Sequence, residues 1–202
     1  MERGDPVASG LDQRRPQLWL ARHGETEWSA DGRHTSRTDL ELTAAGEEQA
    51  DRLAGRLRDV GFDLVLTSPL RRARVTAERT GFPDAEVEPA ATEWAYGEYE
   101  GLTTPVIRES APGWTIWHGD VPGGETADEV GARADRVVAR VREEAPERAL
   151  LFSHGHFLRV VAARWLGQPS SWGEHLKLGT ATLSVLGWER RAPAVEQWNV
   201  RP

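Results

Sequence analysis

Short apolar runs and longer amphipathic stretches alternate along this chain. The first three runs are almost continuously apolar and stop at polar residues, which is typical of strands buried in a parallel sheet. The last two runs predict strands that complete the sheet, and the final one is expected at its edge. The predicted strands cover 17–21, 63–67, 149–152, 183–188 and 194–200, with a further short strand near Val87.

The stretches between these runs have the 3.6-residue period of helices. Thr43 is placed to cap one helix, and Thr126 and Glu129 have the spacing of a capping box before another. Ser68 and Pro69 predict a cap and a first-turn proline for a third helix. The predicted helices cover 43–61, 68–79, 104–110, 126–146 and 157–166.

This alternation predicts an α/β fold, in which helices cover both faces of a mostly parallel central sheet as a three-layer α/β/α sandwich. A chain of 202 residues fits one domain, expected at 17–202, with an insertion at about 94–124. Residues 1–16 are polar and contain Gly and Pro, so we expect a flexible N-terminal tail. They lack the apolar run of a signal peptide or membrane span, which predicts a cytoplasmic protein with no membrane partner.

The amino-acid composition excludes several kinds of functional site. Acidic residues outnumber basic ones 32 to 25, for a net charge of −7, so no general basic footprint for nucleic acid is present. Any anion site must therefore be local. The absence of cysteine excludes a disulfide framework, a thiolate zinc site and a cysteine nucleophile.

Polar residues follow two of the predicted parallel strands. Ligands of such sheets bind at the carboxyl ends of the strands, where Arg22, His23 and His154 are expected to converge. Arg72 falls in the first turn of a predicted helix, where a cation opposes the helix dipole unless an anion is near. Glu93 has partly apolar neighbours and is a candidate acid. Together these residues offer a nucleophile, cations and a proton donor, as phosphoryl transfer requires.

Several other polar and aromatic residues leave two interpretations open. His34 and Thr35 either touch substrate or belong to an exposed loop, and His156 either orients substrate or caps the following helix. Tryptophans fall into two groups: Trp19, Trp165 and Trp188 are expected in the core, whereas Trp94, Trp114 and Trp117 belong either to the core or to the mouth of a pocket.

The ordered motifs resemble the histidine phosphatase superfamily, also called the phosphoglycerate mutase-like family, from about Leu18 to Trp188. The matching pieces are Arg22–Ser29 (RHGETEWS), Leu42-Thr43, Ser68–Ala73 (SPLRRA) with Thr76-Ala77, Glu93–Gly101 (EWAYGEYEG), Gly123–Glu125 (GGE) and Ser153–Gly155 (SHG). The resemblance implies the phosphoglycerate mutase-like fold and a phosphatase of the histidine acid phosphatase type. It also implies a phosphohistidine intermediate.

The resemblance assigns roles to individual residues. His23 would be the phosphorylated nucleophile, with its other ring nitrogen donating to a backbone carbonyl, and Glu93 the proton donor and later the base. Arg22, Arg72 and His154 would bind the transferring phosphoryl group. Ser29 stands where mutases of the family usually have Asn, and its hydroxyl can still donate to phosphate. Further candidate substrate contacts are Thr35, Tyr96, Gly155 and His156.

The short stretch from Glu93 to Gly123 favours hydrolysis, because cofactor-dependent mutases of the family have a longer enclosing insertion there. The motifs look most like the acid phosphatase and sedoheptulose-bisphosphatase-like branches, so we expect a sugar phosphate or another small phosphate ester as substrate and inorganic phosphate as product. We expect no metal and no cofactor, since arginines neutralise the charge.

Three rival functions share parts of this pattern. A phosphoglycerate mutase would use every one of the same catalytic residues. A metal hydrolase could use His154 and His156, whose spacing is common among metal ligands, but would leave Arg22 and Arg72 unexplained. A non-catalytic phosphate-binding module would not need His23 and Glu93. The oligomeric state is also open, with a homodimer as one option.

Overall fold

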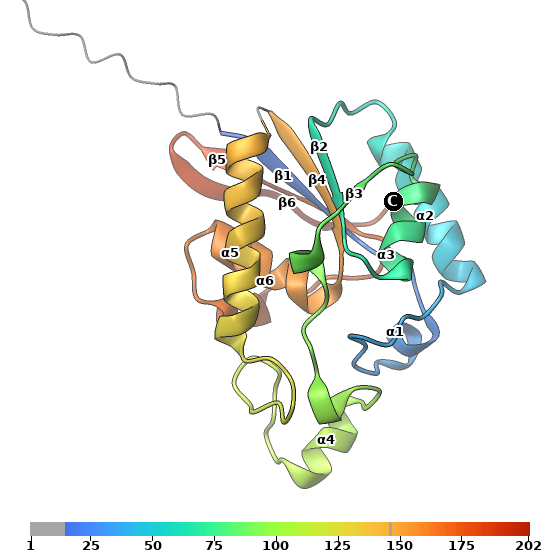
Figure 1. Ribbon diagram of the computed structural model, residues 1–202, viewed down its shortest axis with the longest axis vertical. Helices are drawn as coiled ribbons and strands as arrows, with labels where there is room; N and C mark the ends of the chain where they lie inside the picture. Colours follow the sequence, from blue (N-terminus) through green and yellow to red (C-terminus); the bar gives the residue numbers. More distant parts are fainter. Residues whose placement is uncertain (1–14, 146) are drawn as a thin grey trace, which may run out of the picture.

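A computed structural model describes residues 15–145 and 147–202 and contains a six-stranded sheet in the order β3-β2-β4-β1-β5-β6, with helices on both of its faces (Figure 1). The strands are β1 (Gln17–Arg22), β2 (Leu64–Thr67), β3 (Glu86–Val87), β4 (Arg148–Ser153), β5 (Leu183–Glu189) and β6 (Ala192–Val200).

The centre of the sheet is parallel and one side of it is antiparallel. Strand β4 pairs in parallel with both β1 and β2, whereas β5 and β6 run antiparallel to their neighbours. The register aligns Arg22 with Ser153 and Thr67 with Phe152. The carboxyl ends of β1, β2 and β4 therefore meet at one edge, which confirms the predicted mostly parallel sheet.

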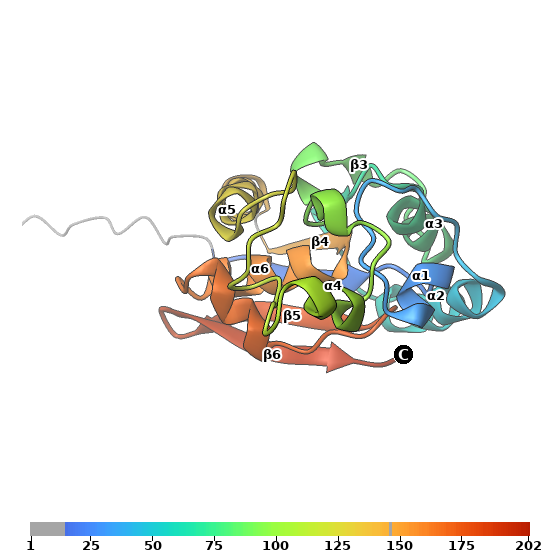
Figure 2. The ribbon, with the colours of Figure 1, turned by 90° about the horizontal axis from the view of Figure 1, so that it is seen from below.

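Helices form the two outer layers (Figure 2). They are α1 (Glu27–Asp31), α2 (Ala44–Leu57), α3 (Arg71–Arg79), α4 (Thr104–Ser110), α5 (Ala127–Glu144) and α6 (Gly155–Trp165), with 3₁₀ turns η1 (Pro89–Ala91), η2 (Gly97–Tyr99) and η3 (Ser170–His175). Successive strand residues point to opposite faces. In β4, Leu151 therefore packs in the core shared with α5 and α6, whereas Phe152 packs in the core shared with α2 and α3.

The predicted helix caps at Thr43 and Thr126 are present. Thr43 accepts from the amide of Gly46, and Thr126 and Glu129 form a reciprocal capping box at the start of α5. The cap predicted at Ser68 is wrong. Helix α3 begins at Arg71, whose amide donates to Asp39 Oδ1 over 2.7 Å, so the capping group comes from a distant loop.

The segment 94–124 contains η2 and α4 and lies below the carboxyl end of the sheet in Figure 1. An antiparallel bridge between Arg33 and Thr103 joins it to the loop after β1. The predicted tail falls mostly outside the described residues, which begin at Arg15; the carbonyl of Pro16 accepts from Trp188 Nε1. Among the described helices, none is long and apolar enough to cross a membrane.

Candidate active site

His23 follows the last residue of β1 and is tied to the neighbouring strand by its amide, which donates to Ser153 O over 3.0 Å. Its ring Nδ1 lies 2.7 Å from Gly24 O. A carbonyl can only accept, so Nδ1 carries the proton and Nε2 is left with a free lone pair. Burial, followed by the charges of Arg72 and Arg22, holds the pKa of His23 well below its usual range. The ring is therefore neutral, as a nucleophile must be.

Two glycines let the loop after His23 lie directly against the start of α2. A Cβ on Gly24 would stand 2.3 Å from the carbonyl oxygen of Gly46, and a Cβ on Gly46 would stand 2.1 Å from that of Glu25. The amide of Gly24 also donates to Thr76 Oγ1 of α3 over 3.0 Å. These contacts fix the position of the His23 backbone from two helices.

Arg22 reaches the cavity beside the first turn of α6. Its Nη1 donates to Leu178 O over 2.7 Å, and its Nε is buried without a hydrogen-bond partner among the described residues. A Cβ on Gly155 would lie 3.2 Å from the guanidinium carbon, so the glycine leaves room for this side chain. Burial lowers the pKa of Arg22.

Arg72 and His154 are fully buried and form a pair next to His23. Arg72 Nε donates to His154 Nδ1 over 3.2 Å, so His154 carries its proton on Nε2 and donates it to Ser68 Oγ over 2.7 Å. Burial, then the charge of Arg72, keeps the pKa of His154 well below its usual range. The His23 and His154 rings lie 5.2 Å apart between centroids.

Glu93 is held by three backbone amides. Its Oε1 accepts from Trp94 and Phe157 over 2.9 and 2.8 Å, and its Oε2 accepts from His156 over 3.0 Å. Two of these amides belong to the first turn of α6, where free N–H groups and the helix dipole attract an anion. The three donors fix the direction of the carboxyl group.

An ion pair supports the backbone around Glu93. Arg133 of α5 contacts both oxygens of Glu125, over 2.7 and 2.8 Å, and donates to the carbonyls of Thr92 and Glu93 over 2.9 and 3.3 Å. Glu125 Oε2 in turn accepts from the amide of Ala95 over 2.9 Å. This pair explains why the Gly-Gly-Glu motif, far from Glu93 in the sequence, belongs to the same site.

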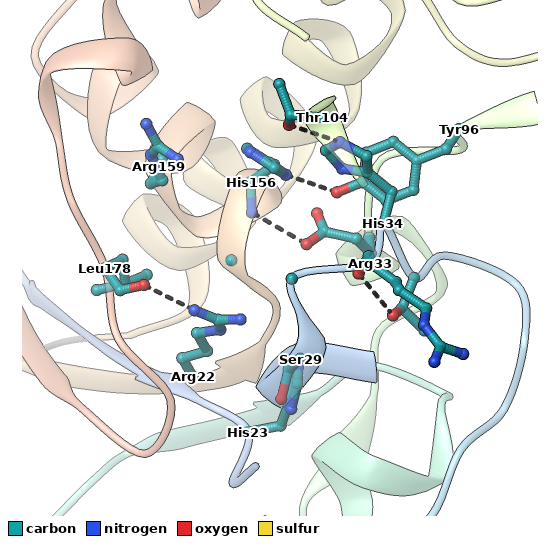
Figure 3. Close-up of a pocket in the computed structure, with 14 residues that line it drawn as sticks. Arg22, His23, Ser29, Arg33, His34, Tyr96, Thr104, His156, Arg159 and Leu178 are labelled. Atoms are coloured by element: carbon teal, nitrogen blue, oxygen red, sulfur yellow. Dashed lines mark hydrogen bonds between the residues drawn. The ribbon is translucent and has the colours of Figure 1, made fainter. Parts of the chain in front are cut away.

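A cavity of about 280 Å³ opens over these groups (Figure 3). Most of the predicted site residues line it: Arg22, His23, Ser29, Thr35, Glu93, Tyr96, Gly155 and His156. Two predicted phosphate ligands, Arg72 and His154, are not in its wall. His34, left open from the sequence, lines the cavity, with its Nε2 3.3 Å from Thr104 Oγ1.

Three polar wall residues were missed from the sequence: Arg33, Thr104 and Arg159. Arg159 had a usable signal, because it lies three residues after His156 and so on the same face of α6. Arg33 and Thr104 had none, since the bridge between their segments is a tertiary contact.

Ser29 and Tyr96 already have partners inside the protein. Ser29 Oγ donates to Thr26 O over 3.0 Å and accepts from the Thr26 amide, as part of the cap of α1, a helix that the sequence did not predict. The hydroxyl of Tyr96 lies 2.5 Å from His156 Nδ1. Burial, then Glu93, raises the pKa of Tyr96 well above its usual value, whereas burial lowers that of His156. The phenol is thus protonated beside a neutral imidazole.

Trp94, Trp114 and Trp117 are buried and outside the cavity wall, which decides the open question in favour of the core. Trp117 still influences the site from behind, because its ring contacts His156 at 5.4 Å between centroids.

The histidine pair of the metal-hydrolase alternative is not arranged as ligands. Both ring nitrogens of His154 and Nδ1 of His156 are used by Arg72, Ser68 and Tyr96. Within 15–145 and 147–202, no three His, Asp or Glu side chains form a group that could hold a metal ion.

Comparison with known proteins matches this geometry to a family. The family model described as the histidine phosphatase superfamily (branch 1) matches residues 18–201. An acid phosphatase of Mycobacterium tuberculosis is 45% identical over 180 residues, which cover 87% of this chain and 88% of the relative. Sedoheptulose 1,7-bisphosphatase of Saccharomyces cerevisiae is 34% identical over 184 residues, with 75% and 68% covered.

Solved structures agree with the sequence relatives. The structure of an open reading frame of Mycobacterium tuberculosis superposes with a TM-score of 0.88 at 40% identity, covering 92% of this chain and 98% of that one. A mycobacterial glucosyl-3-phosphoglycerate phosphatase in complex with VO3 gives 0.81 at 29% identity, covering 92% and 99%. The predicted fold and family are confirmed: the chain belongs to branch 1 of the histidine phosphatase superfamily.

Proposed function

We propose that this phosphatase hydrolyses small phosphomonoesters by transferring the phosphoryl group first to His23 Nε2 and then to water. The observation that carries the proposal is the state of His23, a neutral ring whose Nδ1 proton is held by Gly24 O while Nε2 stays free. Two guanidinium groups close by, Arg22 and Arg72, supply the positive charge that a phosphoryl group needs.

In the first step Nε2 attacks phosphorus, the bond to the leaving oxygen breaks, and Glu93 gives that oxygen a proton. Arg22 has access to the cavity and is the direct ligand of the phosphoryl oxygens. Arg72 uses one Nη1 hydrogen on Thr38 O, and the other is left to donate to a phosphoryl oxygen. In the second step Glu93 takes a proton from water, the water oxygen attacks phosphorus, and the bond between phosphorus and His23 Nε2 breaks to release inorganic phosphate.

Glu93 needs a proton before the first step, and its three amide partners hold the carboxyl group in place. The fixed direction of the carboxyl group then serves both steps.

A sugar phosphate or similar small metabolite is the substrate class we propose. The cavity of about 280 Å³ has a mostly polar wall, including His34, Tyr96 and Thr104 opposite α6 (Figure 3). The name of one relative, sedoheptulose 1,7-bisphosphatase, points to the same class. A cytoplasmic location and a homodimer stay predictions.

A rapid-quench experiment with labelled glucose 6-phosphate tests the covalent step. We expect acid-labile, base-stable label on His23, and its loss together with turnover in His23→Asn. His175→Asn is the matched control, because His175 is exposed and distant in role, and should keep both signals. Turnover near the wild-type rate in His23→Asn would contradict the proposal.

The fate of the phosphoryl group separates hydrolysis from mutase activity. We expect 3-phosphoglycerate to release inorganic phosphate faster than it forms 2-phosphoglycerate, because the segment between Glu93 and Gly123 is short and leaves water access to the phosphohistidine. Phosphorus NMR measures both rates. Formation of 2-phosphoglycerate faster than release of inorganic phosphate would favour the mutase alternative.

A further inference from the structure

The cavity carries more positive charge than the transferred phosphoryl group alone requires. Its wall contains the guanidinium groups of Arg22, Arg33 and Arg159 but only one carboxylate, Glu93. This excess is local, since the whole chain has a net charge of −7. The three arginines differ in whether a carboxylate of the protein already balances their charge.

The charges of Arg22 and Arg33 already have a role or a partner. Arg22 stands beside His23 and belongs to the phosphoryl site. Arg33 forms an ion pair of 2.8 Å with Asp31, so a carboxylate already balances its charge.

Arg159 is different, because the described residues offer it no ion pair. Its Nε and Nη2 donate to the carbonyls of Gly173 and Glu174 over 2.9 and 3.2 Å, and its guanidinium lies over the ring of Trp117 at 4.5 Å. The carboxylate of Glu174 is turned to His118 and His175, at 3.1 and 3.4 Å. No hydrogen bond of Nη1 occurs within the described chain.

Burial without a counter-charge is costly for a cation. Desolvation lowers the pKa of Arg159 to about 10, and the carboxylate of Glu93, which is the main opposing influence, does not offset it. Arg159 lines the cavity, so an anion bound there can approach its guanidinium group.

We propose that Arg159, together with His156, binds a second acidic group of the substrate, so that the preferred substrates are phosphomonoesters that also carry a carboxylate or a second phosphate. This inference rests on the proposed phosphatase function and names the substrate class of the same cavity.

Helix α6 lies beside both arginines. A Cβ on Gly155 would lie 3.2 Å from the guanidinium carbon of Arg22, and Arg159 follows Gly155 by four residues, about one helical turn. Both side chains line the same cavity, so one small substrate can reach both. His156 lies beside Arg159, on the side of Tyr96, in Figure 3. With the Tyr96 hydroxyl as donor to His156 Nδ1, Nε2 of His156 carries a proton and can donate it to the second group.

A matched pair of substrates tests this subsite. Glycerol 3-phosphate and 3-phosphoglycerate differ in one group, a hydroxymethyl in the first and a carboxylate in the second. We expect the wild-type enzyme to have the higher kcat/KM with 3-phosphoglycerate. Arg159→Gln should lower that value about tenfold or more, mainly through KM, and lower the value for glycerol 3-phosphate less than about threefold. Arg159→Lys should recover part of the preference.

Arg33→Gln is the matched control, because it removes a cation from the same wall that Asp31 already balances. It should change the ratio of the two kcat/KM values by less than about twofold. If Arg159→Gln lowers kcat/KM equally for both substrates, Arg159 only supports the structure of η3, and the inference is overturned.

A wild-type enzyme without preference for 3-phosphoglycerate also overturns the inference, and this measurement needs no variant to fold. Failure of the proposed function gives a different result, namely no release of inorganic phosphate from either ester or from glucose 6-phosphate.

Discussion

His23 and His154 lie side by side, and the hydrogen-bond partner of each ring fixes which nitrogen carries the proton. Gly24 O can only accept, so His23 is protonated on Nδ1, and the Arg72 guanidinium can only donate, so His154 is protonated on Nε2. The two rings look alike in the sequence, each at a strand end before a glycine. Their partners make one a nucleophile with a free nitrogen and the other a hydrogen-bonded support for Arg72.

The acid role of Glu93 can be tested through the leaving group. We expect Glu93→Gln to slow the burst of leaving group from a sugar phosphate by about a hundredfold or more, because an alkoxide leaves poorly without a proton. An aryl phosphate should lose much less in the same burst, since a phenolate leaves unaided. Stopped-flow and quench measurements of the burst separate this step from later hydrolysis, in which Glu93 acts as base.

Glutamine keeps the shape of Glu93 and one oxygen that can accept from Trp94 and Phe157, but its NH2 group would face the amide of His156. That loss is common to both esters, so the comparison between them isolates the proton. Equal burst losses for both esters would mean that Glu93 only supports phosphate binding, and would remove it from the acid role.

At the level of elements, the loop 35–38 connects Glu100 to Arg72. Glu100 Oε1 accepts from the amides of Ser36 and Thr38 over 2.9 and 3.0 Å. The same loop offers the carbonyls of Thr35, Ser36 and Thr38 to the Arg72 guanidinium over 3.4, 3.1 and 3.0 Å. Glu100, from the segment 94–124, is thus a positioning residue for Arg72.

Replacing Glu100 with alanine should release this loop and weaken phosphate binding. We expect kcat/KM for all phosphomonoesters to fall about tenfold, and the inhibition constant of inorganic phosphate to rise with it, because one charged hydrogen-bond acceptor is worth about 1.5–3 kcal/mol. Glu98→Ala, two residues away and exposed, is the control and should change neither value. An unchanged inhibition constant would show that Arg72 does not need Glu100.

Elements with strong local signals were predicted from the sequence, and those held by distant contacts were not. The cap at Thr43 and the capping box at Thr126 are made by residues three positions apart, so the pattern contains them. The start of α3 depends on Asp39, 32 residues upstream, and a local reading therefore placed it too early. Helix α1 has five residues and no buried one, so it lacks an apolar period.

The same distinction between local signals and distant contacts applies to the candidate active site. Residues at strand ends were predicted to converge because parallel strands share an edge, and the register of Arg22 with Ser153 places them there. The burial of Arg72 and His154 could not be predicted, because it depends on carbonyls of the loop 35–38 and on the Ser68 hydroxyl.

At the scale of the whole molecule, buried histidines make stability depend on pH. The pKa values of His23, His154 and His156 lie well below 6.5, and burial lowers that of His34 to about 4. Below pH 6.5 the unfolded chain takes up protons that the folded chain does not bind. Stability is therefore fully present above about pH 6.5 and is lost as the pH falls towards the folded pKa values.

We expect Tm to fall steadily between pH 7 and pH 4, measured by calorimetry. His34 alone accounts for about 3 kcal/mol over that range, from a shift of about 2.5 pKa units at 1.36 kcal/mol each. His34→Gln should flatten the profile, whereas His175→Gln, at an exposed position, should leave its slope unchanged. A flat profile in the wild type would show that these rings are protonated in the folded protein.

The position of β1 in the sheet has a consequence for how the protein is made. This strand is the first of the described strands, yet it lies between β4 and β5, which are synthesised more than 120 residues later. Until then the backbone of β1 has no strand to pair with. The central sheet can therefore be completed only after β4 and β5 have left the ribosome. Chains that stop before β5 expose an unpaired, apolar strand, which is the kind of surface that chaperones bind and that aggregates.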